Sequence, residues 1–152
     1  MTFLALDPGE TTGWAFLGPE GFPAIPKPHG ASMGQIAGQQ PLRRWLRALQ
    51  EPPSVIIYES FRIRGHYKNH FGQEHETIQN IGIIKSYYYD LIDMGFEVEL
   101  VKQDPTRKRM GYGWAGLKES GDHSQSHRKD AMAHGVYYVV TKKIRPIIRL
   151  ND

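Results

Sequence analysis

The stretch Ser54–Tyr58 restricts the fold of this chain more than any other. It reads Ser-Val-Ile-Ile-Tyr, a nearly continuous apolar and β-branched run. Such a run is typical of a central strand that is covered on both faces, as in α/β proteins. The run ends in Glu59, and a second short apolar run, Phe3–Leu6, ends in Asp7 before a Pro-Gly turn. We therefore expect two strands that each finish at an acidic residue.

The remaining hydrophobic patterns predict the elements around these two strands. We expect a strand Trp14–Leu17 in a hairpin with the first strand, an irregular strand near Ala31–Ile36, a helix opened by Pro41, a helix from about Glu76 to Met94 closed by Gly95, a strand Phe96–Val101 and a helix from about Ser126 to Lys142. The stretch Lys102–His127 is interpreted as a basic connection that carries glycines. This order predicts an α/β fold, an RNase H-like mixed five-stranded sheet flanked by helices.

Length and composition limit the architecture and the chemistry. A chain of 152 residues is long enough for one domain, residues 1–152, and too short for a two-domain cleft enzyme. No apolar run approaches the roughly 20 residues of a membrane-spanning helix, and the first residues lack the basic start of a secretory signal. The absence of cysteine removes disulfides, thiolate metal sites and cysteine nucleophiles. We expect a cytoplasmic protein.

The net charge of +3 is unevenly divided along the chain. Residues 1–50 carry four Lys and Arg against three acids, residues 51–101 four against eight, and residues 102–152 eleven against five. The basic final third suits a polyanionic partner, and an ordinary solvated face has the same composition.

Four side chains are candidates for chemistry. If the strands that end at Asp7 and Glu59 are parallel neighbours, both carboxylates emerge at the edge where α/β sheets place their sites. His127 and Asp130 are three residues apart and share one helical face. The alternatives are that each acid starts a turn and that the His/Asp pair is a surface ion pair.

Together, Asp7, Glu59, His127 and Asp130 form a ligand set suited to Mg²⁺ or Mn²⁺. Two such ions would neutralise the clustered carboxylates, activate a water and stabilise a leaving oxygen of a phosphodiester, with no organic cofactor. His134, one turn further along, is interpreted as a packed or orienting histidine rather than a ligand.

Three segments of the sequence resemble the RuvC-type Holliday-junction resolvases of the RNase H-like nuclease superfamily. Leu4-Ala5-Leu6-Asp7-Pro8-Gly9 looks like the opening motif of that family, Val55–Glu59 its second acidic strand, and His127-Arg128-Lys129-Asp130-Ala131-Met132-Ala133 its C-terminal acidic helix. The resemblance implies that Asp7, Glu59 and Asp130 are metal ligands, and that His127 takes a position that is Asp in many members and His in some. It further implies a homodimer that nicks two symmetric strands of a four-way junction. The chain resembles a compact member, closer to the phage-encoded relatives than to the bacterial housekeeping enzymes, and its expected location is the cytoplasm of a bacterial or phage-infected cell.

Two basic segments are candidates for DNA contact. The loop after Glu59 interleaves aromatic rings with cations, which suits stacking on bases and contact with phosphates; its candidates are Phe61, Arg62, Arg64, Tyr67 and Lys68. A second cluster follows the fifth predicted strand, where the family places basic residues: Lys102, Arg107, Lys108 and Arg109. A solvated loop and ordinary surface cations are the alternatives. The helix Glu76–Met94, with tyrosines at 87–89, is the candidate dimer surface.

Other functions remain open at this stage. The turn Asp7–Gly13 also resembles the phosphate-binding turn of sugar kinases and actin-like ATPases, but those proteins close two domains around a nucleotide. An RNase H-like nuclease acting on RNA, of the ribosomal RNA processing type, and a catalytically silent branched-DNA-binding protein are the two alternatives.

Overall fold

The structure, a computed structural model of the chain, describes residues 1–20, 23–24, 30–61, 71–118 and 126–149. Its elements, in chain order, are β1 (Phe3–Asp7), β2 (Thr11–Leu17), β3 (Met33–Ala37), α1 (Gln39–Arg47), β4 (Val55–Glu59), α2 (Phe71–Asp93), β5 (Glu99–Gln103), the short 3₁₀ helix η2 (Pro105–Arg107), α3 (Lys108–Ala115) and α4 (Ser126–Arg149). The strands form one sheet in the order β3-β2-β1-β4-β5. The predicted mixed five-stranded sheet flanked by helices is confirmed.

The register of the central strands brings their acidic ends together. β1 and β4 are parallel, with Phe3 opposite Val55 and Leu6 opposite Tyr58. β1 is antiparallel to β2, and β4 is parallel to β5. Because parallel strands point the same way, Asp7 and Glu59 emerge at the same edge of the sheet.

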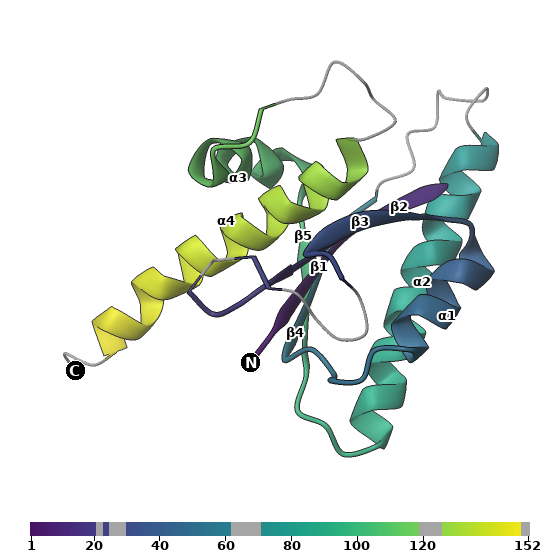
Figure 1. The fold of residues 1–152 in the computed structure, drawn as a ribbon, viewed down its shortest axis with the longest axis horizontal. Coiled ribbons are helices and arrows are strands. Elements are labelled where there is room, and N and C mark those ends of the chain that lie inside the picture. The colour runs from purple at the N-terminus through teal and green to yellow at the C-terminus, as the bar shows by residue number, and fades with distance from the viewer. Residues whose placement is uncertain (21–22, 25–29, 62–70, 119–125, 150–152) are drawn as a thin grey trace.

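The alternation of side chains along each strand divides the core into two layers. Figure 1 shows α4 on one side of the sheet and α1 and α2 on the other. Odd-numbered strand residues such as Ala5 and Ile57 face α4, while even-numbered residues such as Leu6 and Tyr58 face α1 and α2. Asp7 and Glu59 continue the odd-numbered series, so both carboxylates lie on the α4 side.

Small residues allow α4 to approach the sheet closely. A methyl group added to Gly135 would lie 2.2 Å from Leu17 Cδ1, and one added to Gly13 would lie 2.0 Å from the carbonyl oxygen of His127. Neither distance is possible between real atoms. The start of α4 is thereby held against β2, directly beside Asp7.

One helix departs from the sequence expectation. The stretch expected to be a basic connection contains η2 and α3. Asp104 caps this segment, since its carboxylate accepts hydrogen bonds from the backbone N–H of Thr106 at 2.9 Å and from its hydroxyl at 2.8 Å, and Pro105 follows it. Two glycines lower the helix propensity of α3, and its packing against α4 at Gly111 is a tertiary contact that no local pattern shows.

The boundaries of several other elements also differ from expectation. β2 begins at Thr11 rather than Trp14, β3 spans Met33–Ala37 rather than Ala31–Ile36, and α1 begins at Gln39 rather than Pro41. α2 begins at Phe71 rather than near Glu76, β5 begins at Glu99 rather than Phe96, and α4 continues to Arg149 rather than ending near Lys142. None of the helices in the described ranges combines the length and apolar character needed to cross a membrane.

Candidate metal centre

The structure brings all four predicted chemical residues to the edge of the sheet where β1 and β4 end. Asp7 is buried, and Glu59 and Asp130 keep only 12% and 16% of their side-chain surface. The turn after Asp7 is fixed from the other side of the sheet, because the buried Asn80 of α2 donates a hydrogen bond to the Gly9 carbonyl. Asp7 and Glu59 each follow the last pair of the β1–β4 register, Leu6 opposite Tyr58, so the two strand-end acids lie at neighbouring positions.

The first turn of α4 completes the cluster. His127 Nδ1 lies 3.0 Å from Asp7 Oδ2. Asp130, one turn further along, faces Glu59 across a shared lysine. His127 and Asp130 therefore share one helical face, as their spacing predicts, and that face is turned toward the strand ends.

Two residues of α3 belong to the same cluster. Lys108 Nζ lies 3.2 Å from Glu59 Oε1 and 3.4 Å from Asp130 Oδ2, and Tyr112 donates a hydrogen bond of 2.5 Å to Asp130 Oδ1. The sequence pattern predicts Lys108 as a DNA contact and does not point to Tyr112. The spacing of the two residues by four positions is the signal that would have placed them on one helical face, once α3 was recognised.

The carboxylates of the cluster outnumber its positively charged groups, and the pKa values of several of its members are shifted. Burial, the contact with Glu59 and the charges of Glu59 and Asp130 raise the pKa of Asp7 well above its ordinary value. Burial also opposes ionisation of Glu59, but the neighbouring His134 and Asp7 side chains and the charge of Lys108 outweigh it and lower the pKa of Glu59. The surrounding carboxylates raise the pKa of Lys108 despite its partial burial.

The donors present suit a hard divalent cation. Carboxylate oxygens with one imidazole suit Mg²⁺ and Mn²⁺, and burial together with the neighbouring carboxylates raises the pKa of Asp7. In the part of the chain that the structure describes, no three His, Asp or Glu side chains are gathered closely enough to hold an ion as they stand. Lys108 already supplies a positive charge to Glu59 and Asp130.

The predicted DNA contacts have varied positions. Phe61 is half-buried just beyond β4, whereas Arg62, Arg64, Tyr67 and Lys68 lie outside the described residues. Lys102, Arg107 and Arg109 are exposed. The Arg107 guanidinium lies 5.7 Å from the centre of the Tyr137 ring, which itself stacks on Trp114.

The three tyrosines of α2 have different environments. Tyr87 is part of the core between the sheet and α2, and burial raises its pKa to about 12. Tyr88 is half-buried, and Tyr89 keeps 59% of its surface exposed. Only Tyr89 of the three is therefore available to a partner, together with the exposed Ile92 of the same helix.

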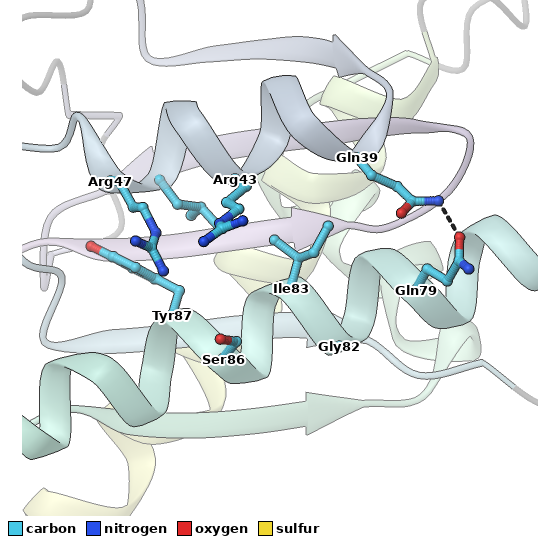
Figure 2. Close-up of a pocket in the computed structure, with 9 residues that line it drawn as sticks. Gln39, Arg43, Arg47, Gln79, Gly82, Ile83, Ser86 and Tyr87 are labelled. Atoms are coloured by element: carbon cyan, nitrogen blue, oxygen red, sulfur yellow. Dashed lines mark hydrogen bonds between the residues drawn. The ribbon is translucent and has the colours of Figure 1, made fainter.

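A pocket of about 370 Å³ lies between α1 and α2, on the sheet face opposite the carboxylates (Figure 2). Arg43 and Arg47 of α1 border it together with Ser86 and Tyr87 of α2. Arg47 is paired with Asp90 at 3.1 Å. This pocket contains none of the residues of the candidate metal centre.

The strand order β3-β2-β1-β4-β5, with helices on both faces of the sheet, is that of an RNase H-like fold. Comparison with solved structures supports this. RuvC of Thermus thermophilus in complex with a Holliday junction substrate superposes with a TM-score of 0.64 at 14% identity, covering 95% of this chain and 97% of that chain. A second structure of Thermus thermophilus RuvC gives 0.56 at 16% identity, covering 95% and 96%. The fowlpox virus resolvase with its substrate Holliday junction DNA gives 0.53 at 12% identity, covering 93% and 99%.

By sequence alone the chain matches no protein-family model, and no curated protein matches it. The likeness to the resolvases is therefore one of fold, over nearly the whole chain.

Proposed function

We propose that this protein is a metal-dependent endonuclease that resolves four-way DNA junctions by paired phosphodiester hydrolysis in a homodimer. The observation that carries the proposal is the convergence of Asp7, Glu59, Asp130 and His127 at the edge where the parallel strands β1 and β4 end. That arrangement occurs here in the fold of proteins solved with Holliday junction DNA.

The four residues would hold one or two Mg²⁺ or Mn²⁺ ions. Such ions supply an activated water and charge stabilisation for a leaving oxygen when they are bound. The protein side chains provide burial and charge. Asp7 and Glu59 are fixed by rigid strands, and His127 orients Asp7 through its Nδ1 contact of 3.0 Å. Tyr112 does the same for Asp130 through its hydroxyl.

The surface beside the centre suits a polyanion. Arg107 and Arg109 lie at the start of α3, next to Lys108, and both are exposed. They are close in sequence to a lysine that contacts the carboxylates, so a phosphate bound by them would lie near the centre. The basic excess of residues 102–152 supports the same assignment.

The dimer surface is proposed on α2. Tyr89 and Ile92 are large apolar side chains exposed to 59% and 41%, three residues apart on one helical face. Two nicks at symmetric positions require two centres related by a two-fold axis, which a paired α2 would supply.

The decisive experiment offers the purified protein four substrates with Mg²⁺ or Mn²⁺: a four-way junction, a linear duplex, single-stranded DNA and an RNA:DNA hybrid. Paired symmetric nicks confined to the junction are expected. The Asp7→Asn variant should lose cleavage, and Asp130→Asn should lose cleavage while retaining junction binding, because it removes negative charge that faces phosphate.

The same assay separates the alternatives. Cleavage of the hybrid alone would assign the protein to the RNA-directed nucleases. Junction binding without cleavage under any metal would assign it to silent branched-DNA-binding proteins. Loss of junction binding in a folded Asp130→Asn variant would contradict the placement of Asp130 against the DNA.

A further inference from the structure

The fully buried His134 of α4 has an unusual environment. Its side chain has 0% exposure, and it lies on the α4 face that packs against the ends of β4 and β5. Its Nδ1 atom is 2.7 Å from Nε2 of Gln103, whereas its Nε2 atom is completely buried and has no hydrogen-bond partner among the described residues. A buried N–H without a partner is costly, so this one calls for an explanation.

The contacts of Gln103 fix the tautomer of His134. The same Gln103 Nε2 atom lies 3.1 Å from the backbone carbonyl oxygen of His134, which can only accept a hydrogen bond. The amide nitrogen therefore faces the histidine, and it donates to both the carbonyl and Nδ1. Because Nδ1 accepts, the ring hydrogen lies on Nε2.

That hydrogen is directed toward Glu59. His134 Nε2 lies 3.8 Å from Glu59 Oε1, which is just beyond hydrogen-bond range. The same Oε1 atom is 3.2 Å from Lys108 Nζ. Gln103 is also the strand neighbour of Glu59, because the two are paired in the β4–β5 register.

We propose that Gln103 and His134 act together as a positioning pair for Glu59. Gln103 holds the ring with its N–H toward the carboxylate. If a bound divalent cation took the place of the Lys108 ammonium, this N–H would still offer Glu59 a donor and would keep its carboxylate directed into the centre. His134 thus acts through Glu59 and does not itself ligate the ion. This inference rests on the proposed function, since it assumes a cation at Glu59.

The tautomer is tested in the unaltered protein. Long-range ¹H–¹⁵N NMR correlations of the metal-free protein, labelled at histidine, should show His134 with a protonated Nε2 and an unprotonated Nδ1. The Gln103→Leu variant should lose this fixed pattern. A protonated Nδ1 in the wild-type ring would overturn the proposal, whatever the nuclease activity.

The role toward Glu59 is tested by Mn²⁺ binding, measured by calorimetry without DNA. His134→Leu should weaken Mn²⁺ binding by about tenfold to a hundredfold, the usual effect of removing a group that orients a metal ligand. His134→Gln places an amide donor near the Nε2 position and should restore most of the affinity. Tyr138 lies on the same helix as His134, and its hydroxyl donates a hydrogen bond to Glu99 of β5. Tyr138→Phe removes that hydroxyl and should leave the Mn²⁺ affinity unchanged.

The outcomes separate the two proposals. Wild-type protein that binds no Mn²⁺ would overturn the proposed function and the positioning role together. Wild-type binding with equal affinity in a folded His134→Leu variant would overturn the positioning role alone. If His134→Leu fails to fold, Gln103→Leu and His134→Gln carry the comparison: Gln103→Leu should lose affinity, and an unchanged value would contradict the proposal.

Discussion

Lys108 Nζ and Glu59 Oε1 lie 3.2 Å apart, and this ion pair joins α3 to the carboxyl end of β4. The same ammonium group also contacts Asp130. The lysine therefore supplies, from within the chain, positive charge to two of the carboxylates that are proposed to hold a metal ion.

Replacing this lysine should have opposite effects on the metal-free and metal-bound protein. Lys108→Met is expected to lower the melting temperature in EDTA, because it leaves the carboxylates without a counter-charge. It should also tighten Mn²⁺ binding by about fivefold, since a half-exposed ion pair is worth on the order of 1 kcal/mol. Calorimetry and thermal denaturation measure both, with the exposed Lys102→Met as control. Weaker Mn²⁺ binding would show that Lys108 does not compete with the ion.

Asp7 should make the metal-free protein less stable as the pH rises. Its pKa is raised in the folded state, so between the ordinary carboxyl pKa near 3.8 and the raised value the folded protein holds a proton that the unfolded chain has lost. Stability from this group is present at low pH and is lost through that window.

Asp7→Asn should remove this loss. We expect a higher melting temperature in EDTA at neutral pH, by about 2–4 °C for a change on the order of 1 kcal/mol, and a difference that shrinks as the pH falls toward 4. The exposed Glu51→Gln is the control. A difference that does not change with pH would rule out Asp7 as its source.

Two glycines of α3 allow a matched test of how closely this helix packs against α4. A Cβ at Gly111 would lie 1.9 Å from the Ala133 carbonyl oxygen of α4, whereas one at Gly113 would meet no atom within 4 Å in the part of the chain that the structure describes. Gly111→Ala should destabilise the protein by about 2 kcal/mol or more through overpacking, and Gly113→Ala should stabilise it by about 0.5–1 kcal/mol. Urea denaturation of both variants measures the difference. Equal effects would contradict the close contact of α3 with α4.

The arginines at the start of α3 should contribute to the salt dependence of the DNA-binding constant. If Arg107 and Arg109 each contact a phosphate, alanine at both positions should reduce the slope of log K against log salt by about 1.8, which is about 0.9 per contact. Fluorescence anisotropy with a four-way junction measures the slope. Arg44→Ala, an exposed arginine of α1 across the sheet, should leave it unchanged. An unaltered slope in the double variant would place the DNA elsewhere.

The assembly should depend on the exposed face of α2. Tyr89→Glu is expected to convert a dimer into monomers in sedimentation velocity, because a charge would be buried in an apolar contact. Met110→Glu changes a side chain of α3 with a similar exposure of 50% and should leave the dimer intact. A Tyr89→Glu variant that sediments with the wild type would exclude this face from the interface.

The sequence by itself determined the strands and their order. An apolar, β-branched run such as Val55–Tyr58 has few places in a protein other than a covered central strand. Period-two alternation then decides which residues share a face, so the convergence of Asp7 and Glu59 was predictable once their strands were taken as parallel neighbours. The spacing of His127 and Asp130 likewise placed both on one side of a helix.

Only the tertiary structure decided which other residues reach these carboxylates. Lys108, Tyr112 and the Gln103–His134 pair come from elements that meet because Gly13, Gly111 and Gly135 permit close contacts with α4. A glycine in the sequence does not reveal which distant atom will occupy the space that a side chain would have filled. Packing between residues far apart in the sequence therefore determined the electrostatics of the centre. The local sequence pattern determined only the positions of the acidic residues at its core.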